Sequence, residues 1–348
     1  MKASVEFIRH MSLKRVISLT PFSKQIPKLL SLGLGLLLIG WLLVQLDFSA
    51  ACQILQDLSV AYVFLGLVLY SLSFYFRVKR FRRLLPQGAR LHTLVPIVLV
   101  HYTALNIIPA RLGEFSYVYF LKRIHHISTG ISVSTLLVAR VFDQMAISSL
   151  FLFSLAWVEL TSPWLKTVSC CVGGGLILSV AFLVLLLVYK RACLRGLMRL
   201  LRVLNWEHCR LAQRGITLLE DVVEGLDVLG SARKVAVIFM FSLFVWLSIL
   251  GVNYMTLRAF QVRLSYVEVM LASTFLILLT VIPFQIFSGL GLRSMTWTVV
   301  AGAMGVSKDT AIVSALGSRV VTTCYLVLLG SFGLWKISGA LSQEEQAL

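Results

Sequence analysis

The sequence is poor in charged residues. Only 14% of its 348 residues are Asp, Glu, Lys or Arg, whereas 58% are hydrophobic, and the mean hydropathy is +0.89. A soluble domain of this size could not keep so much apolar surface away from water. The apolar residues form long continuous runs rather than the short alternating strands of a membrane barrel. The composition therefore predicts an all-α polytopic membrane protein.

The sequence also lacks the common motifs of catalysis and metal binding. Its six cysteines include no C-x-x-C pair, so neither a zinc site nor a disulfide framework is indicated. It has no Walker-type loop, no G-x-S-x-G elbow and no H-E-x-x-H helix. The longest polar segment, 190–233, is too short for a catalytic domain. We expect no enzyme activity, no metal and no cofactor.

Positive charge is in excess, with 32 Lys and Arg against 15 Asp and Glu and a net charge of +17. These basic residues cluster just outside the apolar runs rather than along one surface. Such clustering sets topology and attracts anionic lipid headgroups. It therefore indicates membrane lipids as partners and argues against nucleic acid.

Six uninterrupted spans are predicted, at 29–46, 58–76, 134–157, 168–189, 234–254 and 310–335. The basic tail 1–28 places the N-terminus in the cytoplasm. The basic residues that follow the second span place its end there as well; they are Arg77, Lys79, Arg80, Arg82, Arg83 and Arg90. The remaining segment, 336–348, is a C-terminal tail.

Two further apolar stretches, 91–121 and 266–305, are interrupted by Pro, Gly and charged residues. The first starts after Arg90 and ends before Lys122, both of which we expect in the cytoplasm, so it cannot be one simple span. A re-entrant hairpin with its apex at 106–114 satisfies both charges, and non-helical backbone at that depth requires a protein or water-filled surrounding. We favour re-entrance for 266–305 too; two ordinary spans, which would place the C-terminus outside, remain the alternative.

The order of segments suggests an inverted repeat. Units 29–157 and 168–335 each contain span, span, broken segment and span, with an amphipathic cytoplasmic insert at 190–233. The breaks share a Pro followed by Gly; the structural motif residues are Asn106, Pro109, Gly113, Pro283, Gly289 and Gly291. Inverted repeats with broken helices are typical of transporters, with the substrate site at the repeat interface.

Ionisable residues within membrane segments are costly and therefore indicate function. The candidates for substrate binding are Arg111, Glu114, Arg140, Asp143, Arg293 and Arg319. Because the arginine fork matches phosphate oxygens, this set predicts a cavity for a phosphate-bearing headgroup. Alternatively, Arg140–Asp143 and Arg111–Glu114 are internal ion pairs that only brace the helices.

The segment Asn106-Ile-Ile-Pro-Ala-Arg-Leu-Gly-Glu114, followed by Arg140-Val-Phe-Asp143, resembles the transmembrane region of lysylphosphatidylglycerol synthases, also called the flippase-like domain family. The resemblance covers about residues 25–335. In its second half the family has a Pro-Gly-Gly-Leu-Gly run with a glutamate soon after. Here Phe287-Ser-Gly-Leu-Gly-Leu-Arg-Ser294 has no glutamate, which leaves open any role of that carboxylate.

The resemblance implies movement of lipid headgroups between leaflets, in a bacterial inner (plasma) membrane. The aminoacyl-transfer domain of some members has no counterpart here, so that activity is not expected. The leading hypothesis is a flippase or transporter for a phospholipid or a lipid-linked phosphate, in which one repeat rocks against the other. The alternative is a non-transporting scaffold for an envelope glycolipid or lipid-modifying enzyme.

Overall fold

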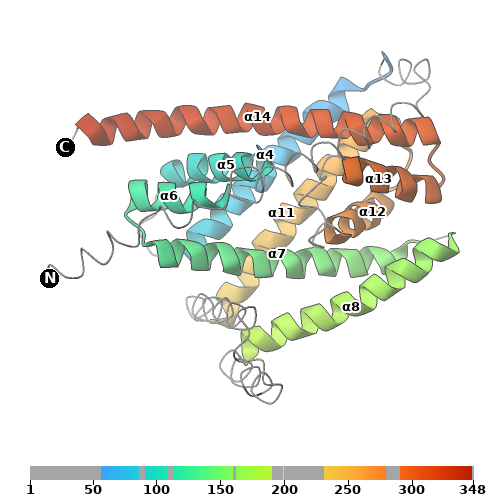
Figure 1. Ribbon diagram of the computed structural model, residues 1–348, viewed down its shortest axis with the longest axis horizontal. Coiled ribbons are helices and arrows are strands. Elements are labelled where there is room, and N and C mark those ends of the chain that lie inside the picture. Colours follow the sequence, from blue (N-terminus) through green and yellow to red (C-terminus); the bar gives the residue numbers. More distant parts are fainter. Residues whose placement is uncertain are drawn as a thin grey trace, which may run out of the picture.

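The computed structural model describes residues 56–85, 91–107, 113–159, 162–189, 199, 231–279 and 291–346, and the elements in these ranges are α-helices (Figure 1). In chain order they are α4 (Val60–Leu84), α5 (Leu91–Ile107), α6 (Glu114–His125), α7 (Thr129–Trp157), α8 (Pro163–Val188), α11 (Ala232–Ala259), α12 (Tyr266–Leu279), α13 (Gly291–Ala303) and α14 (Lys308–Gln346). The predicted all-α class is confirmed.

Five of these helices, α4, α7, α8, α11 and α14, are long and apolar enough to cross a membrane. They coincide with five of the six predicted spans. The sixth, 29–46, lies outside the described residues, as do the tail 1–28 and nearly all of the insert 190–233. The protein is therefore a multi-pass membrane protein.

Serine side chains begin several of the helices. Ser128 precedes α7 and accepts a hydrogen bond from the backbone N–H of Ile131 at 3.4 Å. Before α12, the backbone N–H of Ser265 donates to Glu268 at 2.7 Å, and the backbone N–H of Glu268 donates to the Ser265 hydroxyl at 3.3 Å. This reciprocal capping box satisfies N–H groups that have no partner within the helix.

The predicted end of the second span is wrong. Helix α4 continues through Leu84 instead of stopping at residue 76. Val78, Phe81 and Leu84 are buried, so the apolar face of the helix extends through the basic segment. The basic residues from 77 to 83 therefore belong to the helix and not to a loop. At the other end of the chain, α14 extends beyond residue 335 to Gln346.

Both broken segments are pairs of short helices. Helix α5 ends at Ile107 and α6 begins at Glu114, close to the predicted apex. Helices α12 and α13 similarly flank residues 280–290, which lie outside the described residues. At 1.5 Å per residue, α5 is about 25 Å long and α6 about 18 Å, both short of the ~30 Å hydrocarbon core. The two pairs lie toward opposite ends of the long helices (Figure 1).

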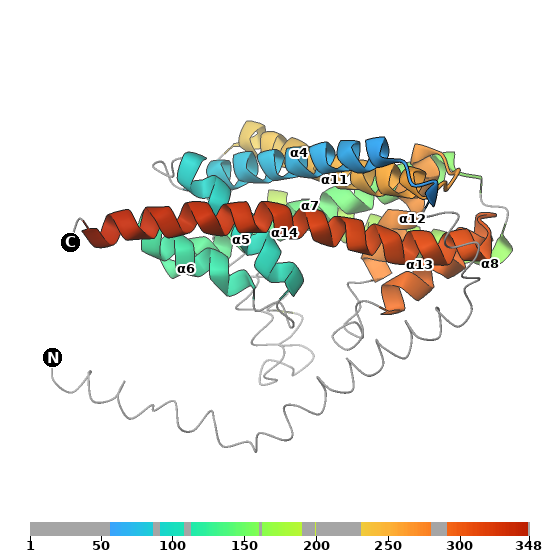
Figure 2. The same ribbon diagram turned by 90° about the horizontal axis from the view of Figure 1, so that it is seen from above.

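Helices of each half pack against the helices of the other half in corresponding positions. Helix α4 lies beside α11 in antiparallel order, with Ser59 next to Ala259 and Arg80 next to Ser242 (Figure 2). Helix α5 of the first half packs on α14 of the second, and α12 packs on α7. This pattern is what two repeats related by a two-fold axis would produce.

Small residues bring α14 and α5 together. A Cβ atom added to Gly330 would lie 2.4 Å from the Thr103 hydroxyl oxygen, and one added to Gly333 would lie 2.9 Å from the Leu99 Cβ. Small residues at helix interfaces permit close backbone approach in membranes. The close contact of α14 with α5 therefore depends on these two glycines.

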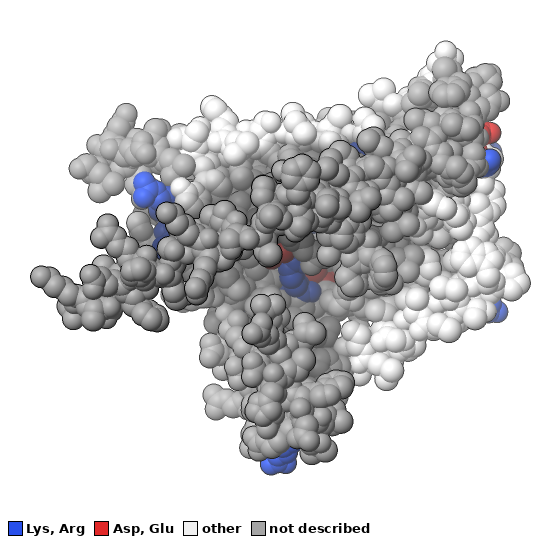
Figure 3. Space-filling model, viewed as in Figure 1, with Lys and Arg blue, Asp and Glu red and all other residues white. Residues whose placement is uncertain are grey.

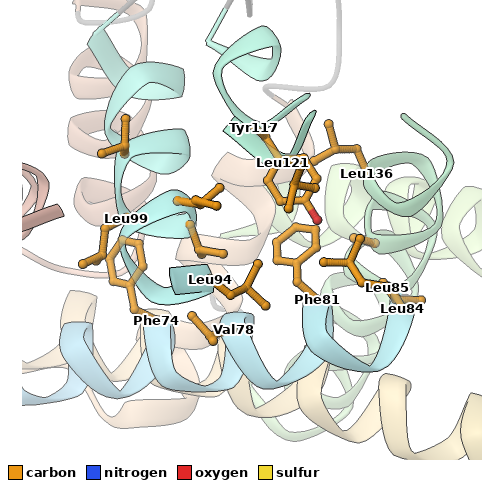
Figure 4. Close-up of a cluster of buried hydrophobic side chains, with 14 of the residues drawn as sticks. Phe74, Val78, Phe81, Leu84, Leu85, Leu94, Leu99, Tyr117, Leu121 and Leu136 are labelled. Carbon is orange, nitrogen blue, oxygen red and sulfur yellow. The ribbon is translucent and has the colours of Figure 1, made fainter. Parts of the chain in front are cut away.

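The core of the first half lies between α4, α5, α6 and α7 (Figure 4). Phe74 and Val78 of α4 meet Leu94 and Leu99 of α5, while Phe81 lies toward α6. The ring centroids of Phe81 and Tyr117 are 4.8 Å apart. Because lipid tails are as apolar as these side chains, close van der Waals packing stabilises the cluster more than exclusion of water does.

Candidate functional site

A buried arginine of α4 is the centre of a polar network. The Arg80 side chain is 0% exposed. Its two terminal nitrogens donate to the two carboxylate oxygens of Asp143 on α7, at 2.5 and 3.1 Å. Such a fork is the strongest arrangement of an arginine with a carboxylate. The charge of Arg80 is thus balanced without solvent.

Helix α11 completes this network. The Arg80 guanidinium also donates to the Ser242 hydroxyl at 2.8 Å, and the Trp246 indole N–H donates to Asp143 at 2.8 Å. Arg80, Asp143, Ser242 and Trp246, which we call the Arg80 network, thereby connect α4 and α7 of the first half to α11 of the second. The network lies across the interface between the predicted repeats.

A second ion pair joins Glu114, the first residue of α6, to Arg140 of α7. It is more open than the first, with side-chain exposures of 30% for Glu114 and 39% for Arg140. Figure 3 shows acidic and basic side chains next to one another near the middle of one face. This second ion pair is therefore partly accessible from outside the helices.

Gly113 positions Glu114. A Cβ atom at residue 113 would lie 2.3 Å from the backbone carbon of Ala104 and 2.4 Å from the nitrogen of Leu105. The start of α6 therefore rests directly on the backbone of α5, and the Ser116 hydroxyl donates to the Gly113 carbonyl at 2.6 Å. This close approach directs Glu114 toward Arg140.

Arg77 is balanced by aromatic rings. It is 9% exposed, and its guanidinium carbon lies 3.7 Å from the centre of the Tyr102 ring and 5.6 Å from that of Phe74. Cation–π attraction is strongest where both groups are withdrawn from water. Helix α4 thus buries two arginines, one bound by a carboxylate and one by ring faces.

We expect Tyr102→Leu to lower the free energy of unfolding by about 2 kcal/mol, because the buried guanidinium loses a π-face. The measurement is thermal or denaturant unfolding of the purified protein in detergent. Tyr102→Phe keeps the ring and serves as the control, with little change expected. Equal losses for the two variants would show that the hydroxyl, and not the ring face, matters.

The end of the α5–α6 pair is basic. Lys122 and Arg123 are exposed in the last turn of α6. Burial lowers the pKa of His125, with further lowering by His92 and His126, so we expect His125 to be neutral near pH 7. The positive charge of this end therefore comes chiefly from Lys122 and Arg123.

The second half holds a cavity of about 100 Å³ between α11, α12, α13 and α14. Arg319 of α14 lines it, together with a set of residues that is largely hydroxyl-bearing; these include Thr256, Ser273, Ser294, Ser314, Ser318 and Thr322. The carboxylates Glu114 and Asp143 are in the first half. The two halves thus differ in charge balance, with ion pairs in one and an arginine beside hydroxyls in the other.

The structure brings together three of the predicted site residues. Glu114, Arg140 and Asp143 lie near one another, but Asp143 pairs with Arg80, and Arg140 with Glu114. Arg319 lies apart, at the second cavity. The side chain of Arg293, in α13, lies outside the described side chains, and four other predicted residues lie outside the described part of the chain: Pro109, Arg111, Pro283 and Gly289.

The remaining motif residues are at helix ends. The Asn106 amide donates to the Tyr102 carbonyl at 2.9 Å and is exposed, and Gly291 is the first residue of α13. Sequence reasoning missed Arg80, Ser242 and Trp246. The burial of Arg80 has a signal in the sequence, because Val78, Phe81 and Leu84 continue a helical apolar face around it.

Five long apolar helices and two pairs of shorter helices in the described part of the chain define a multi-pass helical membrane protein. The chain belongs to the family described as the lysylphosphatidylglycerol synthase TM region, whose model matches residues 28–330. Comparison with curated proteins and with solved structures gave no match. The resemblance inferred from 106–114 and 140–143 is therefore confirmed, and the family relates the chain to membrane lipids.

Proposed function

We propose that this protein moves the phosphate-bearing headgroup of a membrane lipid between leaflets, without chemical turnover. The headgroup crosses through the polar interior while the acyl chains stay in the bilayer. The lipid is a phospholipid or a lipid-linked phosphate, and the setting is a bacterial inner membrane with the N-terminus in the cytoplasm. Family membership and the helical architecture support this proposal.

One observation carries the proposal: polar side chains lie beside both pairs of short helices. The Glu114–Arg140 pair adjoins α5–α6, and the hydroxyl-lined cavity adjoins α12–α13. Charged and polar groups at membrane depth mark substrate pathways because they are otherwise costly to bury. Two such places, toward opposite ends of the bundle, suit a headgroup that enters from one leaflet and leaves toward the other.

The test is leaflet exchange of fluorescent lipids in proteoliposomes, measured by chemical quenching of the outer leaflet. We expect the wild-type protein to exchange a phosphate-bearing lipid and Glu114→Gln to exchange it at least tenfold more slowly. Because that ion pair is partly open, its loss costs only about 0.2–1 kcal/mol of stability, and the variant should fold. Lys166→Gln, on the exposed face of α8, is the control and should exchange at the wild-type rate.

Absence of exchange for anionic, aminoacylated and polyprenyl-phosphate lipids alike would overturn the proposal. A scaffold role predicts a different result in cells. There, Glu114→Gln and Asp143→Ala would leave function intact, whereas charge reversal across 190–202 would abolish it. Turnover of a lipid by the purified protein would contradict the non-enzymatic assignment.

A further inference from the structure

Four of the polar side chains that line the cavity between α11, α12, α13 and α14 have no hydrogen-bond partner among the described residues. Arg319 makes no ion pair and its guanidinium makes no hydrogen bond within the described part of the chain. The Ser318 hydroxyl is buried without a hydrogen-bond partner. The side chains of Asn253 and Ser273 likewise have none among the described residues. Buried donors without partners cost free energy until a ligand satisfies them.

Comparison with the first half shows that the cavity in the second half lacks the corresponding carboxylates. In the chain, Arg140-Val-Phe-Asp143 corresponds to Arg319-Val-Val-Thr322. Arg140 is bound by Glu114, but the broken segment of the second half, through Ser294, has no glutamate after its glycines. Asp143 is replaced by Thr322, whose hydroxyl donates to the Ser318 carbonyl at 2.7 Å. Both carboxylates that balance the first half are thus missing from the second.

The chemistry of the lining defines the ligand. The described residues that line the cavity include one cation and no carboxylate. An arginine fork binds phosphate through two parallel N–H···O bonds, and nearby hydroxyl and amide groups can donate to the remaining oxygens. The same lining offers nothing to neutralise an amine. The cavity of about 100 Å³ is several times the ~30 Å³ occupied by one water, enough for a single phosphate group.

We propose that this cavity binds the phosphate of a net-anionic lipid headgroup, with Arg319 as the charged ligand and Ser318 as a further donor. The inference rests on the proposed function and limits its substrate to lipids whose headgroup has a net negative charge. Lipids whose headgroup also carries a cation should bind more weakly, because the described lining provides no carboxylate for that cation. The Glu114–Arg140 pair, which already holds its own counter-charge, is not the anion site.

The experiment measures binding to the full-length protein in detergent, by ligand-induced thermal stabilisation across a concentration series. The probes are a short-chain phosphatidylglycerol, a short-chain phosphatidylcholine and inorganic phosphate. We expect the anionic lipid to bind at least tenfold more tightly than the zwitterionic one. Arg319→Gln should weaken binding of the anionic lipid at least tenfold, and Ser318→Ala should weaken it a few-fold. Arg319→Lys keeps the charge without the fork and should fall between the wild-type protein and Arg319→Gln.

Two control variants separate this site from general charge effects. Lys336→Gln removes one exposed positive charge from the same helix and should leave binding unchanged. Lys166→Gln removes an exposed positive charge from α8 and should also leave binding unchanged. Because Arg319 has no ion-pair or hydrogen-bond partner among the described residues, Arg319→Gln should keep the melting temperature of the lipid-free protein. If that variant does not fold, Arg319→Lys and Ser318→Ala still test the site.

Wild-type affinity in Arg319→Gln, or equal binding of both lipids, would overturn the inference. Binding of inorganic phosphate but not of the lipid would also overturn it, because the ligand would then be a soluble anion. Leaflet exchange distinguishes this failure from failure of the proposed function. If leaflet exchange occurs but is unchanged in Arg319→Gln, the proposed function is supported and the proposed binding site is wrong. If lipid binding depends on Arg319 but no leaflet exchange is detected, the binding site is supported and the proposed function is wrong.

Discussion

Asp143→Asn is expected to lower the free energy of unfolding by about 3–5 kcal/mol, because it leaves the Arg80 charge buried without its carboxylate. Arg80 is fully buried, so water cannot replace the lost partner. The substituted amide would keep the shape of the side chain and one acceptor, which makes the effect one of charge rather than packing. The measurement is denaturant or thermal unfolding in detergent.

A double-mutant cycle identifies the source of that loss. Arg80→Met and Asp143→Leu together remove both charges, and apolar residues that replace a buried pair are often neutral or stabilising. We therefore expect the double variant to be more stable than either single variant. Lys166→Met, on an exposed side chain, should change stability by less than about 0.5 kcal/mol. Additive losses in the cycle would show that the two residues do not act as a pair.

Gly113→Ala is expected to lower the free energy of unfolding by about 3 kcal/mol or more. The new methyl group would lie 2.3–2.5 Å from backbone atoms of Ala104 and Leu105. Overpacking usually costs about 1–3 kcal/mol where side chains can yield, and here the obstacle is backbone. We also expect leaflet exchange to be lost, because α6 carries Glu114 to Arg140.

Gly130→Ala is the matched control for that prediction. Gly130 is in the first turn of α7, is exposed, and has no atom within 4 Å of an added Cβ. Alanine there should be neutral or stabilise the protein by up to about 1 kcal/mol, through helix propensity. A similar loss for both variants would mean that the close contact at Gly113 is not what limits the substitution.

The broken helices could be predicted from the sequence because charge and topology conflict there. Arg90 and Lys122 both favour the cytoplasmic side, and a single span cannot join them. The structure places the ends of α5 and α6 at the predicted apex. The end of the second span was placed too early, because a count of charges treats Arg77 and Arg80 as residues outside the membrane helix. In the structure, α4 continues through both of them to Leu84. Their burial depends on Asp143 and Tyr102, which are distant in the sequence.

The site was predicted by residue type but not by pairing. Spacing on one helix favoured Arg140 with Asp143, and proximity in the chain favoured Arg111 with Glu114. The structure pairs each carboxylate with an arginine of another helix, which no local rule provides. Trp246 and Ser242 carry no charge, so their approach to Asp143 and Arg80 follows only from the antiparallel contact of α4 with α11.

The Arg80 network has a mechanical consequence. It fastens α4, α7 and α11 together, so a motion that separates the two halves at this point would strip a buried arginine of its counter-charge, at a cost of several kcal/mol. Helix α14 is different, because its contact surface with α5, where Gly330 faces Thr103 and Gly333 faces Leu99, contains no ion pair between described residues. Sliding along that surface breaks no ion pair. The three fastened helices are therefore suited to act as a fixed frame for motions of the other helices.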